Sequence, residues 1–222
     1  MTANRQIGLM GDAPRTCTLC KRLVMFREVN QSAEPDWFNG AVPSYGDPHS
    51  KLIIVGLAPG LHGANRTGRP FTGDYAGDLL YATLLKFGLA RGAYAQHAED
   101  GLELVGCAIT NAVRCVPPEN KPIPEEIRTC NAFLRTTLSH LEQAQALLAL
   151  GRIAHDAVLR AGDLKPSGFL FGHGNEHNLP NGLALIDSYH CSRYNTNTGK
   201  LTTEMIESVV ARAKELAGLT GL

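Results

Sequence analysis

The sequence predicts an α/β fold in which a parallel sheet is flanked by helices. Short apolar runs rich in β-branched residues alternate along the chain with longer segments of helical periodicity, a pattern typical of parallel strands joined by crossover helices. Glycine, proline or asparagine bounds each apolar run, as expected at strand ends. The runs are continuously apolar, so both faces of the predicted sheet should be covered.

Four strands and four helices are expected. The strand candidates span 52–56, 104–110, 145–150 and 183–188. The helix candidates span 78–88, 124–143, 152–162 and 202–218, and proline and glutamate in the first turn support the start of the second helix. Residues 27–50 are rich in proline and glycine and are expected to form a loop that wraps the surface.

Length and composition predict one domain, spanning 1–222. The chain has 222 residues, of which 44% are hydrophobic, enough to bury a substantial core. Basic and acidic residues number 21 each, so affinity for a nucleic acid would have to come from a local basic patch. The first residues lack the apolar region of a signal peptide, and no stretch is apolar enough to span a bilayer. We therefore expect a cytoplasmic monomer without a membrane segment.

Three unusual loops follow predicted strands and should meet at one edge of the sheet. They span 56–74, 110–122 and 188–200. Ligands of such sheets bind at the carboxyl ends of the strands, where these loops begin. The first loop is rich in glycine but lacks the GK[ST] pattern of a nucleotide phosphate loop, which disfavours a mononucleotide-binding enzyme. The three loops together predict a ligand site of another kind.

Four cysteines have a spacing that could bind a metal. Cys17 and Cys20 form a C-x2-C pair, and Cys115 and Cys130 lie in the second loop and the helix after it. In a reducing compartment, such cysteines favour a metal site over disulfides. Spacing alone leaves open a four-iron cluster, a zinc site or unrelated buried thiols. Cys191, in the third loop, is a weaker candidate that could be exposed.

Several separated motifs together resemble the uracil-DNA glycosylase superfamily. They are GLAPGLHGANRTGRPFTGD at 56–74, TNAVRC at 110–115, the cysteine pattern, and HCSRYNTNTG at 190–199. They are most similar to family 5, iron-sulfur enzymes of broad specificity from bacteria and archaea. The resemblance spans about residues 17 to 202.

This resemblance implies a three-layer α/β/α sandwich on a short, mainly parallel sheet. It also implies a [4Fe-4S] cluster whose ligands are Cys17, Cys20, Cys115 and Cys130. The implied activity is excision of uracil, and of other deaminated bases such as hypoxanthine or xanthine, from DNA. A non-catalytic iron-sulfur module that binds DNA is the alternative reading.

Three residues match the superfamily's base-binding positions. Phe71 matches the phenylalanine that stacks on an extruded base, and Asn111 matches the amide that pairs with uracil N3-H and O4. Gly56 and the other glycines of the first loop permit close approach of the backbone to the base. Without the motif, Phe71 would be read as a loop anchor and Asn111 as a residue that ends a strand.

Two further residues match positions that stabilise the transition state. His190 can donate a hydrogen bond to the pyrimidine O2 as negative charge develops there. Asp74 can stabilise the oxocarbenium and orient water, although an aspartate at the start of a helix is also a preferred N-cap. Relatives with a polar side chain after the first glycine use it to manage the water, whereas this chain has Leu57.

The predicted DNA contacts come from the first and third loops. Arg66 and Arg69, with Ser192, Arg193 and Lys200, would form the local patch that holds phosphates. Solvated loop charges are the alternative reading of these arginines. No lysine lies within the motifs except at their margins, so we expect a monofunctional glycosylase that uses water as the nucleophile.

Overall fold

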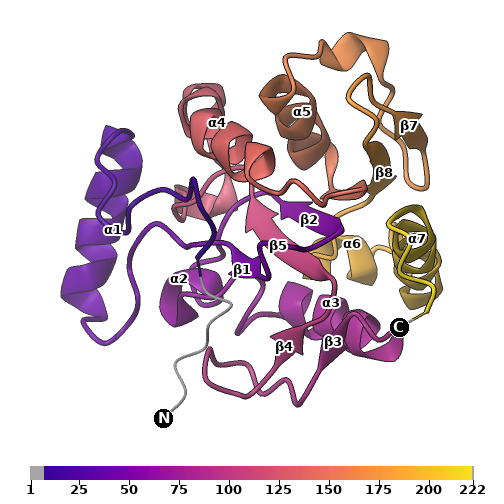
Figure 1. Cartoon of the computed structure of the whole chain (residues 1–222). Coiled ribbons are helices and arrows are strands. Elements are labelled where there is room, and N and C mark those ends of the chain that lie inside the picture. The colour runs from indigo at the N-terminus through magenta and orange to yellow at the C-terminus, as the bar shows by residue number, and fades with distance from the viewer. Residues whose placement is uncertain (1–7, 222) are drawn as a thin grey trace.

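The computed structural model describes residues 8–221 and contains a six-stranded sheet with helices on both faces (Figure 1). The strand order is β1-β5-β2-β6-β8-β7. The four central strands are parallel, and the two short edge strands run antiparallel to their neighbours. In chain order the strands are β1 (Tyr45–Gly46), β2 (Leu52–Gly56), β5 (Cys107–Asn111), β6 (Ala146–Leu150), β7 (Glu176–Asn178) and β8 (Ala184–Ser188).

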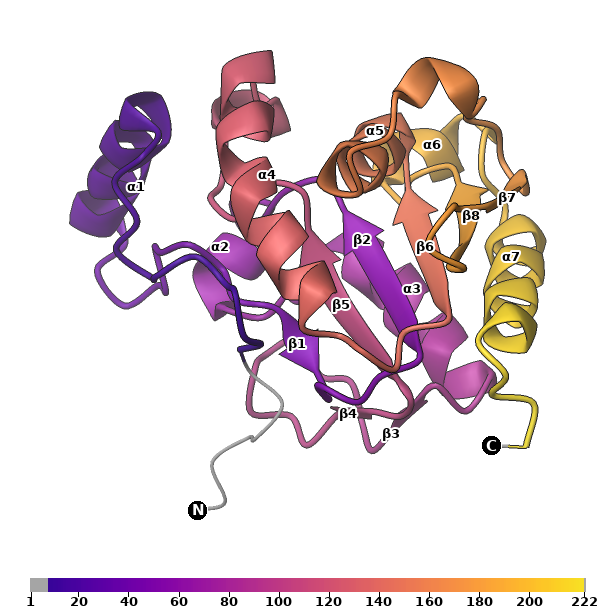
Figure 2. The same ribbon diagram turned by 45° about the horizontal axis from the view of Figure 1, so that its top comes forward.

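Two pairs of helices form the outer layers, as both views of the ribbon show (Figures 1 and 2). Helices α4 (Pro124–Ser139) and α5 (Arg152–Ala161) cover one face, and α3 (Tyr75–Lys86) and α7 (Thr203–Leu216) cover the other. Successive residues of β2 point to opposite faces. Leu52 and Ile54 pack in the α3/α7 core, whereas Ile53 and Val55 pack in the α4/α5 core. This double burial explains the continuous apolar runs.

Smaller elements surround this framework. They are the helices α1 (Lys21–Ala33), α2 (Ala64–Thr67) and α6 (Arg193–Asn197), the 3-10 turns η1 (Pro118–Asn120) and η2 (Pro166–Gly168), and a hairpin of β3 (Ala90–Arg91) and β4 (Glu103–Leu104). Helix α1 lies beside the sandwich, at the left of Figure 2, on the side of β1. Over the described range, no helix has the length and apolarity needed to cross a membrane.

The predicted fold class is confirmed: the sheet is mainly parallel and has helices on both faces. All four predicted strands and all four predicted helices exist, with ends that differ by a few residues. The predicted strand 104–110 is wrong in its first half, because Gly106 adopts a left-handed φ of 65° and separates β4 from β5. The expected loop at 27–50 is wrong over 27–33, which belongs to α1.

The chain order of the strands leaves the three loops at one edge. After β2, the chain passes through α3 to β5 on one side of β2, and then through α4 to β6 on the other side. Such a reversal opens a crevice at the carboxyl ends of the strands. Gly56 and Asn111, the last residues of β2 and β5, lie directly opposite each other in the register.

Candidate active site

A cavity of about 430 Å³ lies at this edge of the sheet. The four central residues of the predicted site line it together: Phe71, Asp74, Asn111 and His190. They come from the first loop, the start of α3, the end of β5 and the loop after β8. The fold therefore brings together side chains that lie more than 100 residues apart in the sequence.

The end of β2 leaves no room for a side chain at Gly56. A Cβ atom there would lie 2.4 Å from Oδ1 of Asn111 and 2.6 Å from the ring of Phe71. Asn111 is 2% exposed, and its Oδ1 is buried without a hydrogen-bond partner among the described residues. A buried acceptor of this kind costs free energy unless a ligand donates to it.

Phe71 is held in an unusual backbone conformation beside His190. Its φ is 52°, in the left-handed region that bulky residues avoid. The residue is 7% exposed, and its ring lies 5.9 Å from the His190 ring, with an angle of 28° between the two planes. The cavity therefore has two nearly parallel aromatic surfaces, one from each of two loops.

Asp74 is both the N-cap of α3 and a cavity residue. Its Oδ1 accepts a hydrogen bond from Gly77 N at 3.1 Å. Its Oδ2 faces two glycines, because a Cβ atom at Gly60 or Gly63 would lie 2.7 or 2.2 Å from it. Burial raises the pKa of Asp74 above its usual range, and the backbone hydrogen bonds offset part of that shift. The structural role as a cap and a role in the cavity are thus compatible.

His190 is neutral over the physiological pH range. Burial lowers its pKa to about 4, because a buried imidazolium would lose its hydration. The backbone carbonyl of His190 accepts a hydrogen bond from Asn195 Nδ2 at 2.8 Å, which ties the loop to α6. A neutral ring can donate one hydrogen bond to a ligand without adding charge to the cavity.

Three of the predicted DNA contacts lie in or beside the cavity. Ser192 and Arg193 line it, and Ser192 also caps α6. Arg193 is exposed, with its guanidinium 5.4 Å from the centre of the Tyr75 ring. Arg66 is half-buried and donates a hydrogen bond through Nε to His62 O at 2.8 Å. Lys200 is exposed and lies 4.9 Å from the centre of the Tyr189 ring.

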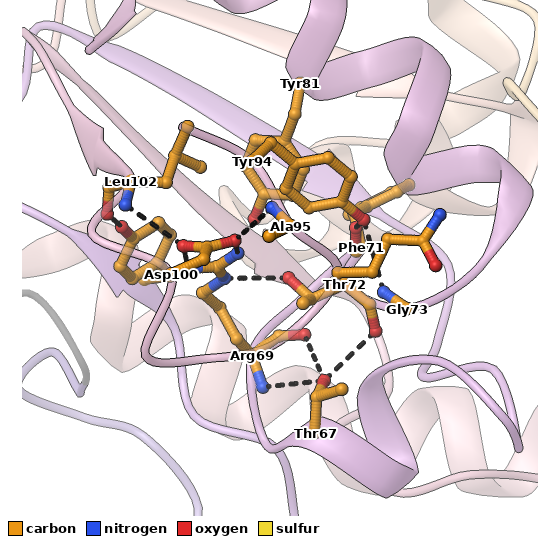
Figure 3. A network of polar contacts seen from close by, with 12 residues as sticks. Thr67, Arg69, Phe71, Thr72, Gly73, Tyr81, Tyr94, Ala95, Asp100 and Leu102 are labelled. Carbon is orange, nitrogen blue, oxygen red and sulfur yellow. Dashed lines mark hydrogen bonds and ion pairs between the residues drawn. The ribbon is translucent and has the colours of Figure 1, made fainter. Parts of the chain in front are cut away.

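The prediction that Arg69 contacts DNA is wrong. Its side chain has no exposure and forms a two-point ion pair with Asp100, with both N···O distances at 2.7 Å (Figure 3). Its Nε also donates to Thr72 Oγ1 at 2.8 Å. Three tyrosine rings surround the guanidinium at 5.2–5.9 Å. Arg69 therefore holds the interior of its loop and cannot reach a phosphate.

Cys191, which the sequence makes a weaker candidate ligand that could be exposed, is buried. It has no exposed surface and packs in the α3/α7 core. Burial raises its pKa to about 12, so the thiol is protonated and unreactive. Its position among apolar side chains removes it from the candidate metal ligands.

Sequence reasoning gave no role to three polar or aromatic side chains that line the cavity. They are His62, Tyr75 and Asn120. His62 packs edge-to-face against Trp37 at 5.5 Å, and Asn120 has a left-handed φ of 56°. Tyr75 follows Asp74 directly, so the motif could have indicated it. No local pattern distinguishes Asn120 from an ordinary turn residue.

The four predicted metal ligands line one small apolar cavity. Cys17 and Cys20 precede α1, whereas Cys115 and Cys130 come from the loop after β5 and from α4. Cys115 and Cys130 are each 7% exposed. Most of the other lining side chains are apolar, among them those of Leu23, Val113 and Phe133. The structure thus gathers the four cysteines that the sequence grouped by spacing.

The spacing of these sulfurs is wide for a single zinc ion. Over residues 8–221, no three cysteine sulfurs lie within 4.8 Å of one another, whereas a tetrahedral zinc site needs about 3.8 Å between sulfurs. Arg114 N donates to Cys130 Sγ at 3.3 Å, and Arg27 Nε is buried without a partner among the described residues. These donors can stabilise negative charge on sulfur ligands.

Comparison with known proteins identifies the family of this chain. Residues 43–214 match the family model described as the uracil DNA glycosylase superfamily. The chain is 47% identical over 209 residues to the Type-5 uracil-DNA glycosylase of Thermus thermophilus, an alignment that covers 91% of this chain and 94% of that protein. It is 38% identical over 206 residues to the Type-5 enzyme of Pyrobaculum aerophilum, covering 91% and 89%. The chain belongs to the uracil-DNA glycosylase superfamily.

Proposed function

We propose that this chain hydrolyses the N-glycosidic bond of deoxyuridine in DNA and leaves an abasic site. The observation that carries the proposal is the buried Oδ1 of Asn111, which lacks a partner among the described residues. Uracil offers an N3-H donor next to its O4 acceptor, and one side-chain amide can pair with both. Membership of the superfamily and the names of the Type-5 relatives support the same substrate.

The base must leave the DNA stack before it can enter this cavity. Phe71 would then stack on the extruded ring while the Asn111 amide pairs with its edge. The glycine at position 56 allows this close approach, since any larger residue would collide with both side chains. Exposed Arg193 and half-buried Arg66 stand at positions from which they can bind phosphates of the flanking strand.

Bond breaking places positive charge on the sugar and negative charge on the leaving base. Ionised Asp74 stabilises the sugar cation and orients a water molecule that attacks C1'. Neutral His190 donates a hydrogen bond to O2 of the departing uracil anion. The described lining residues include no lysine that could form a Schiff base, which supports direct hydrolysis by water.

We further propose that the substrate range extends to hypoxanthine and xanthine. The first loop lacks the tyrosine with which some members of the superfamily exclude the methyl group of thymine, although Tyr75, just after the loop, lines the cavity. The cavity volume of about 430 Å³ leaves room for a two-ring base.

The four cysteines would hold a [4Fe-4S] cluster. When bound, such a cluster would cross-link the segment before α1 to α4, and excision needs no step at the iron. Iron and acid-labile sulfide analysis of protein purified without oxygen tests this proposal. Four of each per chain, with a broad visible absorption band, are expected. Zinc without iron would refute it.

The activity is tested with a duplex that contains one deoxyuridine. We expect release of free uracil and an alkali-labile site, with no strand cleavage before alkali. Duplexes with one hypoxanthine or one xanthine test the wider range. Tight binding of the uracil duplex without base release would instead indicate a non-catalytic binding module.

A further inference from the structure

The β3–β4 hairpin contacts the first loop (56–74) but does not line the cavity. Residues 92–102 connect β3 to β4, and the carboxylate of Asp100 organises them. It accepts hydrogen bonds from Ala95 N at 2.9 Å and Leu102 N at 3.0 Å, and it pairs with Arg69 (Figure 3). Because Arg69 belongs to the first loop, this ion pair joins the two segments.

Within this hairpin, Tyr94 contacts the backbone next to two of the proposed site residues, Phe71 and Asp74. Its hydroxyl accepts a hydrogen bond from Gly73 N at 3.2 Å and donates one to Phe71 O at 3.3 Å. These two backbone groups flank Thr72, and Gly73 directly precedes Asp74. The centre of the Tyr94 ring lies 4.7 Å from that of the Tyr81 ring, and this packing restricts the position of the Tyr94 hydroxyl.

The conformation that this hydroxyl holds is unfavourable in an isolated chain. Phe71 has a φ of 52°, and a bulky residue keeps such a conformation only where the surroundings enforce it. The carbonyl of Phe71 also lies so close to α3 that a Cβ atom at Gly77 would be 1.7 Å from its oxygen. Burial raises the pKa of Tyr94 to about 12, so its hydroxyl keeps the proton needed for the bond to Phe71.

We propose that Tyr94 is a positioning residue for base excision, which sets the Phe71 ring through the backbone of residues 71–73. The inference rests on the role proposed above for Phe71. Tyr94 itself does not line the cavity. Removing its hydroxyl should therefore slow the chemical step and leave affinity for undamaged DNA unchanged.

The test is a double-mutant cycle on the single-turnover rate of uracil release. Tyr94→Phe alone should slow release about tenfold, with an unchanged dissociation constant for a uracil-free duplex. In the Phe71→Ala background, the same change should slow release less than about threefold, because residues that act through one another are not additive. Val158→Ala, in the α4/α5 core, is the control for lost stability and should keep the wild-type rate.

Each outcome decides the proposal. An equal tenfold loss in both backgrounds, or a wild-type rate for Tyr94→Phe, would overturn it. If Phe71→Ala and Asp74→Asn themselves keep full activity, the proposed function of the site fails first. Should Tyr94→Phe not fold, Thr72→Val tests a second contact that holds the same backbone stretch, residues 71–73. It removes the hydroxyl that accepts from Arg69, and it too should slow release without weakening binding to the uracil-free duplex.

Discussion

At the scale of single residues, Asp74 shows how one carboxylate can serve both folding and chemistry. One oxygen caps α3, and the other faces the cavity beside Gly60 and Gly63. The two glycines have no side chain that would cover this oxygen. Asparagine at position 74 keeps an oxygen for the cap but loses the negative charge, so it separates the two roles.

Asp74→Asn should therefore slow uracil release by about 10²–10³-fold while the protein folds and binds a uracil duplex as before. Single-turnover kinetics measure the rate, and a gel-shift titration measures the binding. Asp78→Asn, in the first turn of the same helix, is the matched control and should keep the wild-type rate. A wild-type rate for Asp74→Asn would leave the residue with the N-cap role alone.

The raised pKa of Asp74 also predicts how the rate depends on pH. In the proposed mechanism the ionised carboxylate is the active form, so the rate should rise with pH through a midpoint above the ordinary 3.8 and then reach a plateau. His190 stays neutral down to about pH 4 and should not limit the rate on that plateau. The acid limb should vanish in Asp74→Asn, and its persistence there would assign it to another group.

At the scale of elements, a buried ion pair joins α5 to β8. His155 Nδ1 lies 2.7 Å from Asp187 Oδ1, and its Nε2 lies 3.0 Å from Phe169 O. Both ring nitrogens face acceptors, an arrangement that favours the protonated ring. Burial alone would lower the pKa of His155, but the hydrogen bond and the charge of Asp187 outweigh it, and the pKa is raised. His177 Nε2 faces the other oxygen of Asp187 at 3.4 Å.

Asp187→Asn should lower the free energy of unfolding by about 3–5 kcal/mol, because it removes the charged partner of the buried His155 ring. The pKa of His155 is higher in the folded protein than its ordinary value of 6.5. The ion pair therefore stabilises the folded state fully below pH 6.5, and this stabilisation is lost as the pH rises through the folded-state pKa. Urea unfolding at pH 6 and at pH 9 should thus show the larger difference from wild type at pH 6. The exposed pair of Asp163 and Arg135 gives the control Asp163→Asn, which should change stability little. An equal loss at both pH values would contradict a charged His155.

Elements whose apolar residues face the core in a regular pattern were predictable from sequence, and α1 was not. The four central strands are buried on both faces, so their apolar runs predict them. Helix α1 instead buries Leu23 and Arg27 while Met25 and Val29 are exposed, which removes the periodicity that identifies a helix. Leu23 packs in a cluster with Val113 and Cys130, and Arg27 donates to the backbone carbonyls of Arg15 and Cys17.

Site residues that belong to a motif were predictable from sequence. The position of a side chain that depends on a partner far away in the sequence was not. The motifs predicted that Asp74 and His190 share a site, and both line one cavity. Arg69 has the composition of a phosphate contact, but its ion pair with Asp100, 31 residues away, determines where its side chain lies. A single sequence contains no signal for that pairing.

At the scale of the whole molecule, the proposed cluster would fasten the N-terminal segment to the sandwich. Cys130→Ser should remove the visible absorption band, lower the melting temperature and expose residues 8–33 to limited proteolysis. These losses follow because the segment contributes only a small part of the apolar core. Cys107→Ser, in β5 and away from the four ligands, should keep the band. Full iron content in Cys130→Ser would contradict the assignment.

A crystal structure of Asp74→Asn bound to a duplex with one deoxyuridine tests most sharply whether the cavity binds an extruded base. The uracil should lie against Phe71, with its N3-H and O4 paired to the Asn111 amide and its O2 facing His190. A uracil that stays stacked in the duplex, or that binds away from these three side chains, would contradict the proposed site.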